Sequence, residues 1–150
     1  MKSGLVLEGG GTRGIYTAGI LDVFLEYGIE FDGVIGVSAG AIHGVSFVSK
    51  QKGRSIRYYK KYCNDPRFMG VRSWIKTGEV LKHRYISYNE SMKYIERLEK
   101  EGKVLVIRPK KALDIGRLEN NPEKTQEIYD VGYQDGLKMI EKVKTFLDAK

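Results

Sequence analysis

The stretch Gly-Val-Ile-Gly-Val-Ser-Ala-Gly-Ala, at residues 33–41, decides the fold of this chain. It is typical of a short buried strand that turns sharply into a helix, with Ser38 at the turn inside a Gly-x-Ser-x-Gly motif. A serine that stands out from the end of a sheet needs a strained backbone. Gly36 and Gly40 remove side chains that would collide with the strand and the helix. The spacing predicts either an exposed nucleophilic serine or a glycine-rich turn with an idle one.

A second glycine-rich turn lies near the start of the chain. Residues 4–7 are a short apolar run typical of a buried parallel strand, and Glu-Gly-Gly-Gly-Thr-Arg-Gly follows at residues 8–14. An apolar stripe between Tyr16 and Tyr27 predicts a helix that Gly28 ends. With a strand at 31–37 and a helix at 39–49, the order predicts a βαβα unit whose two strands are parallel.

In such a unit the carboxyl ends of both strands lie at the same edge of the sheet, where open α/β sheets bind ligands. The glycine loop and Ser38 should therefore face one crevice. Backbone N–H groups of Gly9, Gly10 and Gly11 could hold the oxyanion of a tetrahedral intermediate formed at Ser38. Arg13 either adds positive charge at that edge or is a solvated arginine at the start of a helix.

The same glycines also fit a dinucleotide fingerprint. Gly9, Gly11 and Gly14 satisfy Gly-x-Gly-x-x-Gly, which binds a pyrophosphate when an acidic residue stands near the far end of the second strand. Here Glu30 and Asp32 stand at the beginning of that strand, and its far end carries Ser38. A nucleotide site is therefore the weaker interpretation.

Composition limits the classes of protein further. The 150 residues suit one domain with a real core, and the net charge of +7 favours anionic partners. The single cysteine, Cys63, excludes an internal disulfide and a four-cysteine zinc site. No signal peptide and no apolar run of membrane-spanning length is visible, which predicts a soluble, cytoplasmic protein.

The two motifs, Gly-Gly-Gly-Thr-Arg-Gly after one strand and Gly-Val-Ser-Ala-Gly after the next, resemble the start of the patatin-like phospholipases. The resemblance covers residues 4–80 and resumes at 88–147. It implies one domain over residues 1–150, with a three-layer α/β/α fold around a small, mostly parallel sheet. It also implies hydrolysis of lipid or other carboxylic esters without a cofactor or metal. Carried over, Ser38 is the nucleophile, and the oxyanion-hole loop holds Gly9, Gly10, Gly11 and Arg13.

The chain departs from that family at the catalytic aspartate, which the family carries in an Asp-Gly-Gly or Asp-Gly-Ala motif well after the serine. Asp32-Gly33 precedes Ser38 at the wrong end of its strand, and Asp135-Gly136 falls in a helix. The sequence passes from the family's early region to its late region near residues 79–88, without the central segment. We therefore expect slow hydrolysis or, alternatively, a lipid- or anion-binding remnant without turnover.

Residues 50–62 interleave basic residues with tyrosines. This pattern suits an anionic membrane surface to which the protein binds peripherally, or a solvated helix with its tyrosines inward; we do not expect nucleic acid.

A sheet of about three strands would leave an unpaired edge, which favours self-association. His43 lies five residues after Ser38 on the same helix, so we expect His43, like His83, to be structural rather than a base.

Three further elements are expected in the second half. Asn89 should cap a helix through Lys100, and residues 103–107 should form a third strand. Asn121-Pro122-Glu123 should start a long final helix, because proline fits the first helical position. Gly132 and Gly136 would weaken that helix unless another element packs closely against them.

Overall fold

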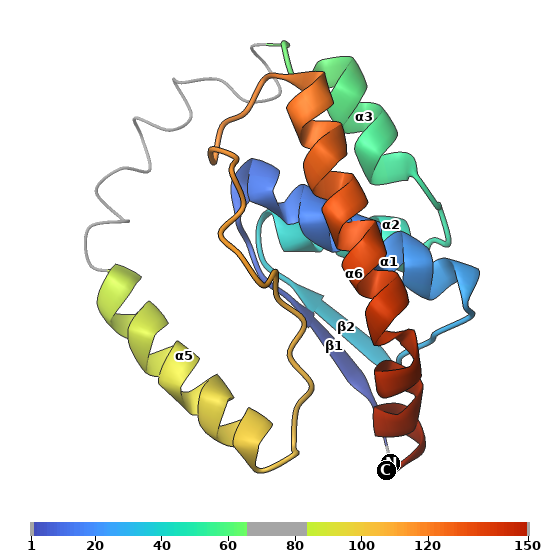
Figure 1. Ribbon diagram of the computed structural model, residues 1–150, viewed down its shortest axis with the longest axis vertical. Helices are drawn as coiled ribbons and strands as arrows, with labels where there is room; N and C mark the ends of the chain where they lie inside the picture. The colour runs from blue at the N-terminus through green and yellow to red at the C-terminus, as the bar shows by residue number, and fades with distance from the viewer. Residues whose placement is uncertain (1, 66–83, 150) are drawn as a thin grey trace. The chain divides into compact units, whose positions relative to one another are not determined.

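The computed structural model describes residues 2–65 and 84–149 of the chain (Figure 1). The chain divides into two compact units. The first consists of Met1–Asn64 and Pro109–Lys150, and the second of Asp65–Arg108. The glycine loop and Ser38 both belong to the first unit, which is described first.

The first unit is a mixed α/β structure around a small parallel sheet. Along the chain its elements are β1 (Gly4–Leu7), the 3-10 helix η1 (Gly11–Gly14), α1 (Ile15–Glu26), β2 (Gly33–Gly36), α2 (Ala39–Val48), α3 (Arg54–Tyr62) and α6 (Pro122–Asp148). β1 and β2 pair in parallel, with Gly4 opposite Gly33 and Leu7 opposite Gly36. The predicted order of strand, glycine loop, helix, strand and helix is confirmed.

Helices cover one face of this sheet. On that face α2 approaches so closely that a Cβ on Gly44 would lie 3.1 Å from the Leu7 side chain and 3.4 Å from that of Val34. On the opposite face, Val6 and Ile35 are paired neighbours and are 75% and 66% exposed. Alternate side chains of a strand point to opposite faces, so among the residues that the structure describes no helix covers the face of the exposed pair. The mixed α/β class is confirmed, but the expected three-layer arrangement is not.

α1 forms the centre of the core of the first unit. Most of its residues are buried, including Ile15 and Val23 with no exposed surface. The Phe24 ring contacts Phe31, which in turn contacts Phe47 of α2, with centroid separations of 6.0 and 6.1 Å. The helix ends at Glu26, and Gly28, whose φ of +65° suits glycine, turns the chain just beyond it, as expected.

The buried carboxylate of Asp22 connects α1 to two other helices. It accepts hydrogen bonds from the backbone N–H of Gly53 at 3.0 Å, directly before α3, and from the Tyr129 hydroxyl of α6 at 2.7 Å. A buried carboxylate is costly unless it is hydrogen-bonded, so these donors compensate for its burial. Burial, together with the hydrogen bond to Asp22, raises the pKa of Tyr129 well above its usual value.

α6 packs against α1 through glycines. A Cβ on Gly132 would overlap the carbonyl oxygen of Tyr16, and one on Gly136 would lie 3.1 Å from the Cα of Ile20. From the other side, a Cβ on Gly19 would overlap the carbonyl oxygen of Tyr129. The two helices make the most extensive helix contact in the first unit (Figure 1). Another element therefore packs closely against Gly132 and Gly136, as expected from the sequence.

The start of α6 is also as expected. The side chain of Asn121 accepts hydrogen bonds from the backbone N–H groups of Glu123, at 2.8 Å, and Lys124, at 3.2 Å. Pro122 occupies the first helical turn. These contacts satisfy two of the N–H groups that every helix leaves open at its beginning.

The second unit contains one helix within its described part, α5 (Arg84–Lys100), which begins earlier than the expected residue 89. The chain turns after it at Gly102, whose φ is +68°. The strand expected at residues 103–107 is wrong, because these residues form no strand. They belong to the second unit, whereas β1 and β2 belong to the first. Their apolar composition fits a strand, but a strand also needs a neighbour, which local sequence does not reveal.

No helix within residues 2–65 and 84–149 combines the length and the apolar character needed to cross a membrane.

We predict that Gly132→Ala destabilises the chain. Alanine favours a helix over glycine by about 1 kcal/mol, so an open position would gain stability. At this position the new methyl group collides with the Tyr16 carbonyl, and overpacking of this kind typically costs about 1–3 kcal/mol. Urea unfolding of Gly132→Ala should show a lower free energy of unfolding than the parent. Gln134→Ala, at an exposed position of the same helix, is the control; a Gly132→Ala protein as stable as that control would contradict the prediction.

Candidate functional site

Ser38 stands in a strained backbone conformation between β2 and α2. Its φ is 53° and its ψ is −122°, a combination that residues with a Cβ rarely adopt. Its neighbours in the motif are tightly enclosed. A Cβ on Gly36 would lie 2.6 Å from the backbone of Ala41, and one on Gly40 would overlap the carbonyl oxygen of Leu7. Ser38 itself is exposed, so its hydroxyl group is accessible while its backbone is fixed.

The glycine loop lies directly beside Ser38. A Cβ on Gly9 would be 3.0 Å from the Cβ of Ser38 and 2.8 Å from the carbonyl oxygen of Val37. Within the described residues, the backbone N–H groups of Gly9, Gly10 and Ala39 donate no hydrogen bond. The edge of the sheet thus carries an exposed hydroxyl group together with uncommitted N–H donors, as the parallel arrangement of the two strands predicted.

The far end of the glycine loop is held by the segment that leads into α6. The backbone N–H and the Oγ1 hydroxyl of Thr12 each donate to the carbonyl oxygen of Arg117 at 3.1 Å, and Thr12 Oγ1 accepts from the N–H of Glu119 at 3.1 Å. Thr12 has no exposed surface. Gly11, with a φ of +60°, lies so near that a Cβ on it would be 2.5 Å from the same Arg117 oxygen.

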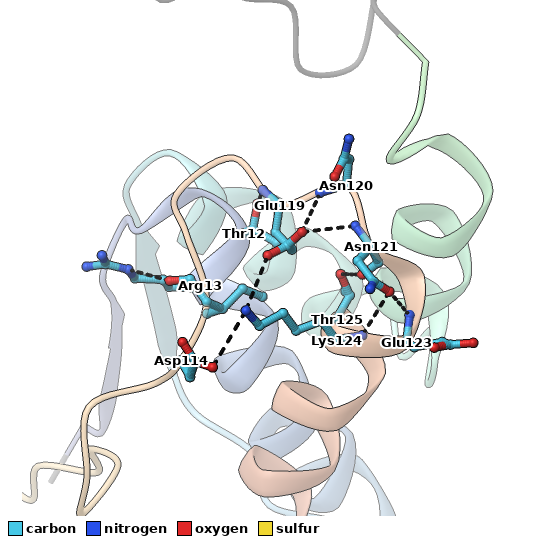
Figure 2. A network of polar contacts seen from close by, with 10 residues as sticks. Thr12, Arg13, Asp114, Glu119, Asn120, Asn121, Glu123, Lys124 and Thr125 are labelled. Atoms are coloured by element: carbon cyan, nitrogen blue, oxygen red, sulfur yellow. Dashed lines mark hydrogen bonds and ion pairs between the residues drawn. The ribbon is translucent and has the colours of Figure 1, made fainter.

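This segment is itself held by a polar network (Figure 2). The side chain of Glu119 accepts hydrogen bonds from the N–H groups of Asn120 and Asn121, both at 3.1 Å. The Lys124 ammonium lies 3.9 Å from Glu119 and 3.6 Å from Asp114. The first turn of α6 and the glycine loop are therefore parts of one connected arrangement.

Arg13 points its guanidinium group away from this network (Figure 2). Its Nε donates to the carbonyl oxygen of Ile115 at 3.3 Å, and the residue is exposed. Arg13 therefore contributes to the attachment of the C-terminal segment. Its role beside an oxyanion stays a prediction.

The two aspartates considered from the sequence are engaged elsewhere. Asp32 accepts from the N–H of Ser3 at 2.7 Å and from its hydroxyl at 3.1 Å, at the strand ends opposite Ser38. These hydrogen bonds hold the pKa of Asp32 below its usual value. Asp135 accepts from the Tyr16 hydroxyl at 3.1 Å and contacts Lys138. Among residues 2–65 and 84–149, no hydrogen bond to Ser38 Oγ is formed.

His43 is buried on α2 and forms no hydrogen bond with Ser38. Its Nδ1 lies 3.0 Å from the Oγ of Ser55 on α3, and a Cβ on Gly14 would lie 3.0 Å from its Nε2. Nε2 has no hydrogen-bond partner within the described part of the chain. Burial lowers the pKa of His43 to about 4, so the ring is neutral near neutral pH. These contacts agree with the structural role expected for His43; His83 lies outside the described residues.

The basic stretch at residues 50–62 forms α3 after a turn. Its charged side chains are exposed, namely Arg54, Arg57, Lys60 and Lys61, whereas Tyr59 is buried and Tyr58 is half-buried. Tyr59 donates its hydroxyl proton to the carbonyl oxygen of Gly11 at 3.4 Å. The helix thus turns Tyr58 and Tyr59 inward, leaves Tyr62 exposed, and has a basic outer face.

Sequence reasoning missed Thr12 and Glu119. Thr12 stands in the sequence only as one residue of the glycine motif, and Glu119 belongs to no motif. A buried threonine between a glycine and an arginine has no periodic signal, and its partners are more than 100 residues away. Only the tertiary arrangement brings them together.

Comparison with known proteins gives two matches. Residues 76–148 match the family model "Domain of unknown function (DUF6363)". A 78-residue stretch is 36% identical to "Uncharacterized protein YjjU" of Escherichia coli (strain K12). That alignment covers 51% of this chain and 22% of the relative, so the chain spans about a fifth of the length of the curated protein it matches. No solved structure gives a significant match.

These matches correct one expectation. The sequence motifs pointed to the patatin-like phospholipases, but the matching family is a domain of unknown function and the matching relative is uncharacterized. The assignment of the chain to that family is therefore wrong. The glycine loop and Ser38 both lie outside residues 76–148. Their chemistry must be argued from their own geometry.

We predict that His43 makes stability fall as the pH is lowered. The unfolded chain binds a proton at the ordinary histidine pKa of about 6.5, whereas the folded chain resists it down to about 4. The contribution is therefore complete above about pH 6.5 and is lost as the pH falls towards 4. The free energy of unfolding should drop by about 2 kcal/mol between pH 7 and 5.

The measurement is urea unfolding of the parent and His43→Gln at both pH values. The parent should lose stability between them and the variant should lose less, whatever their difference at pH 7. Equal losses would show that His43 does not cause the pH dependence.

Proposed function

We propose that the first unit is a serine acyl-ester hydrolase in which Ser38 is the nucleophile. The observation that carries this proposal is the backbone of Ser38, with a φ of 53° in an exposed turn between a strand and a helix. Strain of this kind costs about 1–3 kcal/mol and tends to occur where function requires it. A glycine would occupy the same turn without strain, so a serine there supports a role for its hydroxyl group.

The donors around Ser38 support the same chemistry. The N–H of Ala39 follows the serine at the first position of α2, and the N–H of Gly9 or Gly10 comes from the neighbouring loop. A pair made of the residue after the nucleophile and a loop N–H is the usual way in which such a turn stabilises an oxyanion. One such donor contributes about 3 kcal/mol to transition-state stabilisation.

The proposed reaction has two steps. Ser38 Oγ bonds to the ester carbonyl carbon and gives up its proton, and the carbonyl oxygen becomes an oxyanion held by the N–H groups. The intermediate collapses, the C–O bond to the alcohol breaks, and the alcohol leaves with a proton. Water then attacks the acyl-serine and releases the carboxylic acid. No base is hydrogen-bonded to Ser38 within the described residues, so we expect slow turnover and activated esters as the best substrates.

Esters with apolar acyl chains, lipids among them, fit the surroundings of Ser38. Val37, directly before the serine, is 52% exposed, and Ile42, whose N–H bonds to the Ser38 carbonyl, is 46% exposed. Exposed apolar side chains next to a reactive group favour contact with an apolar part of a ligand. They support an apolar acyl group as the substrate class.

A second candidate function is binding of a lipid surface or another anion without turnover. The basic outer face of α3 favours it, because Arg54, Arg57, Lys60 and Lys61 are all exposed. Such a face attracts anionic headgroups, and the attraction weakens with salt. In this proposal the chain acts in the cytoplasm at the membrane surface. In the described residues the sheet has two strands, and its outer edges carry no further strand. In this proposal, the chain also self-associates through one of these edges.

We predict that a fluorophosphonate probe labels Ser38 and that Gly9→Ala slows the labelling strongly. The new methyl group of Gly9→Ala meets Ser38 Cβ and the Val37 carbonyl, which displaces the donor from the serine. Gly4→Ala is the matched control, because a Cβ on Gly4 meets nothing within 4 Å and Gly4 lies at the other end of β1 from the loop. Loss of one aligned donor corresponds to about a 100-fold slower reaction. Intact-mass measurement over time gives the rates.

Labelling that persists in Ser38→Ala would contradict the assignment of the nucleophile. Equal slowing by Gly9→Ala and Gly4→Ala would contradict the role of the loop. An unlabelled parent protein that binds anionic vesicles in a salt-sensitive manner would favour the binding function instead.

A further inference from the structure

Thr12 joins two parts of the chain that lie more than 100 residues apart. Its N–H and hydroxyl both bond to the Arg117 carbonyl, and its hydroxyl also accepts from the Glu119 N–H. The residue is fully buried and directly follows Gly9–Gly11. We propose that Thr12 is a positioning residue that uses the main chain of Arg117 and Glu119 to hold the N–H groups of the glycine loop beside Ser38. This inference rests on the proposed function.

Contacts hold the glycine loop at both ends, and Thr12 provides the contact at its C-terminal end. At its beginning, the carbonyl groups of Leu7 and Glu8 pack on Gly40, where a Cβ on the glycine would be 2.7 Å from the Glu8 oxygen. At its end, the buried side chain of Thr12 bonds to Arg117 and Glu119 of the C-terminal segment, and the exposed Arg13 adds a hydrogen bond to the Ile115 carbonyl. Gly9 and Gly10 lie between these two points and donate no hydrogen bond of their own within the described residues.

Glycines make this support necessary. A Gly-Gly-Gly sequence has more backbone freedom than any other, so three glycines without hydrogen bonds would sample many orientations of their N–H groups. Donors contribute to catalysis when they are already oriented before the reaction. The hydrogen bonds of Thr12 restrict the loop through residues that touch no substrate.

The Arg117–Glu119 segment is in turn supported from α6. Glu119 accepts from two successive backbone N–H groups and lies near the Lys124 ammonium, as Figure 2 shows. A change at Glu119 should therefore reach the glycine loop without altering the loop itself. In this proposal, residues 115–124 support the Ser38 site. They fall within the stretch that matches the domain of unknown function.

The test compares Thr12→Val with Thr12→Ser. Valine keeps the shape but removes the hydroxyl group, and serine restores it. Thr125→Val is the matched control, since Thr125 is equally buried and its hydroxyl bonds only within its own helix region, to the Asn121 carbonyl at 2.9 Å. Glu119→Ala is a second variant that acts from the other side of the contact. The rate of fluorophosphonate labelling of Ser38 is measured in each full-length variant, together with the 15N order parameters of Gly9–Gly11.

We expect Thr12→Val and Glu119→Ala to label at least 10-fold more slowly than the parent, with order parameters of Gly9–Gly11 that fall below about 0.6. Thr12→Ser and Thr125→Val should behave like the parent in both measurements. Parental labelling and parental order parameters in Thr12→Val would overturn the inference, as would equal effects of Thr12→Val and Thr125→Val. If Thr12→Val does not fold, Glu119→Ala decides in the same way.

The two proposals fail differently. An unlabelled Ser38 in the parent would contradict the proposed function, and the order parameters alone would then decide whether Thr12 fixes the loop. If the parent labels normally and Thr12→Val has the same labelling rate and order parameters, only the positioning role is contradicted.

Discussion

The site depends on the close approach of the first turn of α2 to the end of β1. Gly40 lies against the carbonyl groups of Leu7 and Glu8 so tightly that no Cβ fits there. Because β2 must end beside β1 and α2 must begin at this contact, the two residues between them, Val37 and Ser38, have to reverse the chain sharply. Ser38 takes the positive φ that this reversal requires. Burial of the apolar Phe47 side chain on a following turn of α2 compensates for the strain.

A second close contact carries the C-terminal part of the chain to the same place. Glycines on α1 and α6 let the two helix backbones approach each other, and α6 therefore begins near the glycine loop. The segment before α6 reaches Thr12 only because of this packing. Two sets of glycines thus have different roles. Those near Ser38 shape the site, and those between α1 and α6 position the segment that bonds to Thr12.

Local signals explain which parts of this structure the sequence could predict. Each short strand, the turn at Ser38 and the Asn121 cap of α6 depend on residues within a few positions of one another, and they form as expected. The parallel pairing of the two strands follows from their order along the chain, with a helix between them. The strand at residues 103–107 and the second helix layer both depend on distant partners. The strand expectation is wrong, and the second helix layer is not confirmed. Thr12 was missed for the same reason. The family assignment was wrong although its two motifs do fold as strand-end turns, because motif geometry and ancestry are separate properties.

The central claim is that Ser38 forms a covalent bond with an ester carbonyl carbon. Rapid-quench mass spectrometry of the protein mixed with nitrophenyl acetate, followed by peptide mapping, tests it most directly. The account predicts one acetyl group per chain, located on Ser38 and formed before water releases it. Acetylation confined to lysines or to Cys63, with Ser38 unmodified at every time point, would contradict it.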